Sequence, residues 1–201
     1  MHTFEAIRSR RAVKHFDPNH RLTKDEENML IDLACQTPSS FNIQHWRLVK
    51  VTDPKLRHQI REVSADQAQV TDASLLLVVC GDVKAWEKNP KRYWNETPKQ
   101  VQDIILPWIH SFYDGKEQLQ RDEVMRSVGL IAQTIMLAAK AMNYDSCPMI
   151  GFDQEKVASL INLPKDHAIG MMLVVGKIVK LSGAKPGFIE KADMIIENRF
   201  S

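Results

Sequence analysis

The sequence has no apolar run long enough to cross a membrane. Its longest such run, residues 75–80, is far shorter than the roughly 20 apolar residues of a membrane-spanning helix. Residues 1–10 lack the apolar region of a signal peptide. We therefore expect a cytoplasmic protein, and the apolar share of 44% in 201 residues is enough for the core of one domain.

Motifs for metal binding and for nucleophilic catalysis are also missing. Cysteine occurs three times, without C-x-x-C spacing and among apolar neighbours typical of buried thiols, at Cys35, Cys80 and Cys147. The seven histidines form no H-x-x-x-H or H-E-x-x-H pair, and there is no G-x-G-x-x-G or Walker A motif. We expect no metal site, no Rossmann dinucleotide fold and no P-loop. The net charge of +2 is too small to indicate a nucleic-acid partner by itself.

Hydrophobic periodicity predicts alternating helices and buried strands. The predicted helices cover residues 3–10, 24–37, 121–143 and 154–161, with another starting at 54, and the predicted strands cover 47–51, 74–80, 170–179 and 194–196. Residues 147–153 are predicted to form a turn. In residues 83–118 the pattern is weak and three prolines would break any long helix, which indicates an inserted excursion or lid. The result is an α+β or α/β sandwich.

Two polar stretches carry the functional signal. Arg10, Arg11 and Lys14 place three positive charges within five residues, a pattern suited to a phosphate monoester because guanidinium groups bind phosphate oxygens bidentately. A solvated basic face or a weak nucleic-acid patch are the alternatives. Residues 38–46 concentrate small polar side chains and backbone N–H groups between a helix and a strand. This turn can hold a polar, planar ligand, although an ordinary loop has the same composition.

These motifs, in this order, resemble the nitroreductase family of FMN-dependent homodimeric flavoproteins. The matches are the R-x-x-x-K segment followed by Phe16-Asp17, the P-S-S-x-N-x-Q turn ending in Trp46, the Gln67-x-Gln69-Val70 segment, the long apolar helix and the 148–151 turn. The resemblance covers nearly the whole chain. It implies a single domain over 1–201 with a central, mostly antiparallel sheet flanked by helices, an excursion over about 83–118, and a C-terminal tail over 182–201 that is exchanged in a homodimer.

The resemblance also implies a cofactor site. Its residues would be Arg10, Arg11, Ala12, Lys14, Pro38, Ser39, Ser40, Asn42, Gln67, Gln69, Pro148, Met149, Ile150, Gly151 and Lys185. The basic residues would lie near the FMN phosphate and the pyrimidine side of the flavin, where Lys14 would favour negative charge on the reduced ring. Residues 38–42 would come from the other subunit, and 148–151 would run along the flavin. Phe112 and Tyr113 would form part of a substrate lid, or else simply pack within the excursion.

The sequence departs from the family pattern at three places. Ala12 stands where many relatives have a serine, and His45 replaces a proline common before the tryptophan. In the tail only Lys185, with Lys191 as a second possibility, supplies the basic residues that relatives use for the phosphate. We therefore expect weaker FMN binding than in typical members.

The activity implied by the resemblance is reduction of nitroaromatics, quinones or related electron-poor acceptors with NADH or NADPH, by ping-pong kinetics and without a catalytic amino acid. The sequence does not choose between the two donors, and no nucleic-acid or membrane partner is expected. Two other functions stay open. One is a non-catalytic FMN-binding or storage protein, and the other is a nucleic-acid adaptor that binds through Arg8, Arg10 and Arg11.

Overall fold

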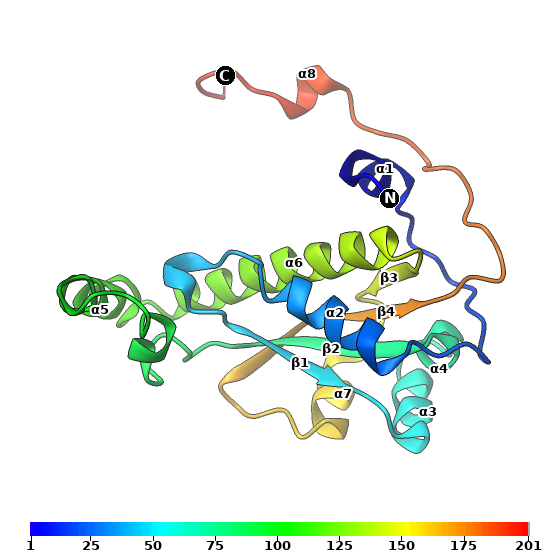
Figure 1. Cartoon of the computed structure of the whole chain (residues 1–201), viewed down its shortest axis with the longest axis horizontal. Helices are drawn as coiled ribbons and strands as arrows, with labels where there is room; N and C mark the ends of the chain where they lie inside the picture. Colours follow the sequence, from blue (N-terminus) through cyan, green and yellow to red (C-terminus); the bar gives the residue numbers. More distant parts are fainter. Residues whose placement is uncertain (201) are drawn as a thin grey trace.

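A four-stranded antiparallel sheet with helices on both faces forms the body of the protein, as the computed structural model of residues 1–200 shows (Figure 1). The strand order is β1-β2-β4-β3. In chain order the elements are α1 (Thr3–Ser9), α2 (Lys24–Ala34), η1 (Ser40–Asn42), β1 (Trp46–Lys50), α3 (Pro54–Glu62), α4 (Gln69–Asp72), β2 (Leu75–Asp82), η2 (Pro90–Tyr93), α5 (Lys99–Tyr113), α6 (Glu117–Ala141), β3 (Asp145–Met149), α7 (Gln154–Leu160), β4 (His167–Gly176) and α8 (Lys191–Met194). The predicted α+β class is confirmed.

Strand β2 is buried along its whole length. Leu77 and Val79 lie in the core formed with α2 and α6, whereas Leu76 and Val78 lie in the core formed with α3 and α7. Successive side chains of a strand point to opposite faces of the sheet, so an uninterrupted apolar run requires cover on both faces. The predicted central strand is confirmed.

Helix α6 approaches the sheet most closely at two glycines. A Cβ atom on Gly81 would lie 2.3 Å from Val124 Cγ1, and one on Gly170 would lie 2.3 Å from Val128 Cγ1. By length and composition α6 could cross a membrane, but in this fold its buried side chains pack on the sheet. It is the core helix of the domain, and it includes most of the helix predicted over 121–143.

Local signals correctly located three helix starts. Thr23 Oγ1 accepts a hydrogen bond from the Glu26 N–H at 3.2 Å, which completes the predicted capping box of α2. Asp53 caps α3 and Asp153 caps α7.

The prediction that prolines break any long helix in 83–118 is wrong, because α5 continues through Pro107. A proline inside a helix removes one backbone hydrogen bond and costs about 3 kcal/mol. Ile109 and Tyr113 of α5 are fully buried against Ile43 and Trp86. This burial offsets the cost, since each large apolar side chain contributes roughly 1.5–3 kcal/mol.

Two further predictions about local structure require correction. Residues 145–149 form edge strand β3, so the predicted turn begins only after Met149. Pro148 is tolerated there because β4 is the only named strand beside β3, leaving one side of the strand without a ladder partner to satisfy. Cys35 is exposed, unlike Cys80 and Cys147, because it follows directly after the last turn of α2 on the solvent side.

The C-terminal tail, defined here as residues 179–200, follows β4 and extends away from the sheet and its covering helices (Figure 1). The predicted strand over 194–196 is not formed in the described chain, where α8 ends at Met194 and Ile195 and Ile196 are exposed. Without a neighbouring strand, an isolated three-residue segment has no partner for its backbone groups. Large apolar side chains such as Phe188, 81% exposed, therefore remain uncovered within one protomer.

Candidate functional site

The basic residues 10–14 lie beside edge strand β3. Val13 N–H donates to the Ser146 carbonyl at 3.1 Å, and Ala12 forms an isolated parallel bridge to the same residue. Val13 is buried, while Ala12 and Lys14 are exposed. Because neighbouring side chains of an extended segment alternate, anchoring Val13 in the core holds Lys14 at the surface.

Residues 182–186 of the tail lie beside residues 10–12 and form with them a hollow of about 320 Å³. Arg10, Arg11 and Lys185 line it together with Ser182, whose Oγ donates to the Ala12 carbonyl at 3.4 Å. We call this the first basic hollow. Within residues 1–200 none of the three cations forms an ion pair with a carboxylate. Three uncompensated cations around one hollow suit the oxygens of a phosphate group.

A chain of amides joins two other predicted segments. Gln67 Nε2 donates to the Gly151 carbonyl at 3.0 Å, and Gln69 Nε2 donates to Gln67 Oε1 at 2.8 Å. Gln69 is buried, so its amide fixes the orientation of the more accessible Gln67. The fold thus brings residues 67–69 to the end of β3.

Cys147 of β3 lies near the basic residues 10–14. Burial raises the pKa of the Cys147 thiol, while the charges of Lys14 and Arg10 act in the opposite direction. Both cations therefore lie near β3. Three predicted segments, 10–14, 67–69 and 148–151, consequently gather around one end of this strand.

Side chains 148–151 are divided between core and surface. Met149 is buried in the core, so only its backbone can reach a ligand. Ile150 is 74% exposed. This end of β3 therefore combines a basic hollow, an amide edge and one exposed apolar side chain.

The fourth predicted segment lies elsewhere in the protomer. Figure 1 places the turn between α2 and β1 at the α5 end of the molecule, away from β3. Asn42 Nδ2 donates to the Tyr93 carbonyl and Trp94 Nε1 donates to the Phe41 carbonyl, each at 3.0 Å. No hydrogen bond or ion pair of the described chain joins residues 38–42 to the other three segments. One protomer does not unite all four.

Positive φ angles occur in and beside the turn at 38–44 and directly before Gln67, a signal that the sequence did not reveal. They occur at Phe41 (50°), Asn42 (54°) and Gln44 (51°), and at Ala65 (51°) and Asp66 (50°) immediately before Gln67. The other non-glycine residues with positive φ among residues 1–200 are all asparagines, at positions 89, 143, 162 and 198. Asparagine and aspartate tolerate this conformation, so the cost of roughly 1–2 kcal/mol each falls on Phe41, Gln44 and Ala65. Strain of this kind is concentrated at ligand sites.

The predicted lid residues have different environments. Tyr113 is fully buried and stacked on Trp86 with ring centroids 6.0 Å apart, and burial raises the pKa of its hydroxyl to about 12. This environment agrees with the packing alternative for Tyr113. Phe112 is 39% exposed and touches Phe41 edge-on, so it can still face a ligand.

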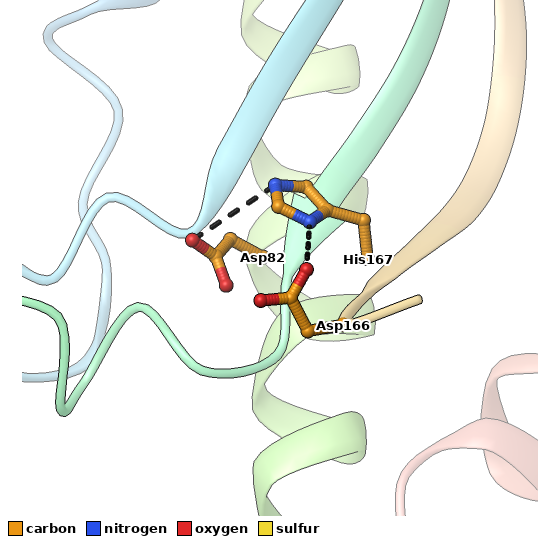
Figure 2. A group of neighbouring side chains, drawn as sticks. All are labelled: Asp82, Asp166 and His167. Carbon is orange, nitrogen blue, oxygen red and sulfur yellow. Dashed lines mark hydrogen bonds and ion pairs between the residues drawn. The ribbon is translucent and has the colours of Figure 1, made fainter. Parts of the chain in front are cut away.

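An unpredicted charged cluster lies where β2 ends and β4 begins, as Figure 2 shows. His167 Nδ1 lies 2.7 Å from Asp166 Oδ1, and its Nε2 lies 3.9 Å from Asp82 Oδ2. Such a group can hold a metal ion, but here Lys88 already supplies a positive charge, 2.9 Å from Asp82 and 2.5 Å from Asp166. The hydrogen bond from Lys88 lowers the pKa of Asp166 to about 2. The cluster is an ion-pair network that fastens the excursion to the sheet.

His45, the residue in place of the common proline, is buried at 1% exposure. Its Nδ1 lies 3.1 Å from Ser127 Oγ of α6. Burial lowers the pKa of His45 to about 4, so the ring is neutral near pH 7. It is a packing residue beside the strained turn.

Comparison with known proteins gives a consistent result. The model of the Nitroreductase family matches residues 7–177. The chain is 59% identical over 177 residues to protein DrgA of Synechocystis, which covers 88% of this chain and 84% of that protein. It is 28% identical over 192 residues, 90% of each chain, to the oxygen-insensitive NADPH nitroreductase of Helicobacter pylori.

A solved structure agrees with these sequence matches. It comes from Exiguobacterium sibiricum and is described as a "putative nitroreductase in complex with FMN". Its TM-score is 0.88 at 25% sequence identity, over 98% of this chain and 97% of that one.

Proposed function

The chain belongs to the nitroreductase family, and from this membership we propose that it is an FMN-dependent oxidoreductase. It would use NADH or NADPH to reduce nitroaromatics, quinones or related electron-poor acceptors. The observation that carries the proposal is the gathering of residues 10–14, 67–69 and 148–151, with Lys185, around one end of β3. A compact hollow of this kind suits one phosphate group better than an extended nucleic acid.

The residues present fit FMN. The first basic hollow offers three cations to the phosphate, Gln67 offers an amide to the polar chain or ring edge, and Ile150 offers an apolar surface to the ring. Ala12 provides no hydroxyl, but Ser182 lines the same hollow and brings one from the tail. That hydroxyl donates to the Ala12 carbonyl, so the expectation of weaker FMN binding stands.

When bound, FMN supplies the redox chemistry, taking a hydride from the nicotinamide and passing two electrons to the acceptor. Lys14 is exposed beside β3, where its positive charge would favour negative charge on the reduced ring. Because donor and acceptor would occupy the same exposed face in turn, we expect ping-pong kinetics.

We propose that the working form is a cytoplasmic homodimer with FMN at the subunit interface. Residues 38–42 would be supplied by the partner, since one protomer holds them away from β3. Phe4 of α1, 65% exposed, and the apolar residues of the tail supply surface that a second copy would cover.

The visible absorption spectrum of the purified protein, recorded before and after anaerobic addition of NADPH and then NADH, tests this function. We expect a flavin spectrum that bleaches with at least one donor. A flavin spectrum that survives both donors would favour the storage alternative. No bound flavin after incubation with FMN would overturn the proposal altogether.

A further inference from the structure

A second basic hollow of about 410 Å³ lies at the β1 edge of the sheet, the edge opposite β3. It is formed where β1 ends, α3 begins and β2 starts, and none of the predicted cofactor residues lines it. Four of its lining residues carry or can carry positive charge, namely Arg21, Lys50, Arg57 and His58. Glu27 is its only acidic lining residue.

The charges in this second basic hollow are not balanced. Lys50 Nζ pairs with Glu27 at 2.6 Å, which uses the single carboxylate. Within residues 1–200 neither Arg21, Arg57 nor His58 forms an ion pair. Arg21 donates only to the backbone carbonyls of residues 18 and 20.

Arg57 is held rigidly within the wall of the hollow. It is only 9% exposed, its Nε donates to the Val51 carbonyl at 3.1 Å, and its Nη1 donates to the carbonyls of Thr71 at 3.3 Å and Ala73 at 2.8 Å. Its Nη2 donates to the Ser74 carbonyl at 3.4 Å, which leaves one N–H of the guanidinium group free. Burial, and then the charge of Arg21, lower the pKa of Arg57, so an anion in the hollow would favour its charged form.

We propose that the second basic hollow binds a small phosphate-bearing anion between Arg21 and Arg57, with His58 as a further hydrogen-bond donor. The Nε and Nη2 groups of Arg21 are not used in the hydrogen bonds of its Nη1, so they can meet phosphate oxygens in geometry as well as charge, while Arg57 contributes its charge and one N–H. The hollow is larger than an inorganic phosphate ion requires, and the side chains of Thr52 and Ser74 line the remaining space. This points to a phosphate monoester of a small polar molecule. The site does not depend on the proposed FMN function.

Calorimetric titration of the full chain with inorganic phosphate and with glycerol 3-phosphate, at constant ionic strength, tests this site. The variants are Arg21→Gln and His58→Gln, which change exposed side chains and spare the structural hydrogen bonds of Arg57. Arg121→Gln on α6 is the matched control, and Arg10→Gln reports on the first basic hollow. We expect Arg21→Gln to weaken binding by about tenfold and His58→Gln to weaken it less.

Arg121→Gln should bind both probes with wild-type affinity. Arg10→Gln should keep the binding event that Arg21→Gln weakens. Tighter binding of glycerol 3-phosphate than of phosphate would support the monoester. Equal binding of both would support a site for the phosphate group alone. The proposal is overturned if wild-type protein binds neither probe, if Arg21→Gln binds both as wild type does, or if Arg10→Gln abolishes all binding.

Discussion

Arg10 and Arg11 meet Lys185 in a hollow to which the two ends of the chain contribute. The family resemblance implied the contribution of Lys185, but nothing in the sequence indicated that of Ser182. Ser182 reaches the hollow only because the tail turns back over Ala12. A side chain that depends on the path of an irregular segment has no periodic signal in the sequence.

We expect Arg10→Gln to weaken FMN binding by about tenfold, because one charge-assisted hydrogen bond contributes roughly 1.5–3 kcal/mol. Arg8→Gln is the matched control, since Arg8 is exposed on α1 and does not line the hollow. Flavin fluorescence during titration and after dialysis gives the affinity. Equal FMN retention by both variants would contradict the proposal that Arg10 binds the FMN phosphate.

His45 should make the protein sensitive to acid. Its pKa is about 4 in the folded protein, against 6.5 for an unperturbed histidine such as that of the unfolded chain. Between these values the unfolded chain binds a proton that the folded chain does not, so the free energy of unfolding falls as pH decreases from 6.5 to 4. His45 should contribute about 1.4 kcal/mol per pH unit to the slope of the free energy of unfolding between these values, and it should contribute nothing to this slope above pH 6.5.

Urea unfolding at a series of pH values, compared between wild type and His45→Gln, measures this slope. The variant should lose the His45 share of the slope, whereas the dependence near pH 4 that comes from Glu26 and Asp166, whose pKa values are lowered to about 2, should remain. His2→Gln is the control, because His2 is exposed and should leave the slope unchanged. A wild-type slope that His45→Gln does not alter would exclude His45 as its source.

The excursion is the element whose attachment the structure explains best. Lys88 bridges Asp82 and Asp166, and the Asp82 side chain is only 4% exposed. We expect Lys88→Gln to lower the free energy of unfolding by about 1–2 kcal/mol, because the buried Asp82 carboxylate then keeps only the more distant Arg47, at 3.6 Å, as a permanently charged partner, and because Lys88 itself is partly exposed. Hydrogen exchange of residues 84–98 should accelerate.

Lys99→Gln provides the comparison for that variant. The Lys99–Asp103 pair is exposed, at 82% and 60%, so its loss should change stability by less than about 0.5 kcal/mol. If both variants had the same stability and exchange, the ion-pair network would have no anchoring role.

Elements with local signals could be predicted, and those that depend on distant contacts could not. The capping box at Thr23 and the continuous apolar run of β2 belong to the first group. Helix α5 belongs to the second, because only its burial against Ile43 and Trp86 outweighs Pro107. The same holds for the Lys88 network, whose members come from separate segments. The composition of the turn at 41–44 indicates a loop, but it does not reveal the positive φ angles.

For the whole molecule, the proposed dimer makes a sharp prediction about mixed subunits. Arg10→Gln and Asn42→Ala homodimers should each bind FMN poorly. Because a composite site takes Arg10 from one subunit and Asn42 from the other, a heterodimer of the two variants contains one intact site. Denaturing and refolding an equal mixture should restore about a quarter of all sites.

Flavin content per chain after refolding is the measurement. Each variant refolded alone is the control and should hold less flavin per chain than the refolded mixture, when the FMN concentration is kept close to the wild-type dissociation constant. No recovery in the mixture, although heterodimers are present by mass spectrometry, would contradict a site shared between subunits.

The strand order β1-β2-β4-β3 has a consequence for how the chain reaches its folded state. The central partners β2 and β4 are separated in sequence by α5, α6, β3 and α7, so their pairing closes a long loop. During synthesis β2, apolar along most of its length, leaves the ribosome well before β4 exists to cover its free edge. We expect slow folding that finishes only after translation, and dependence on chaperones whenever synthesis outpaces the arrival of β4.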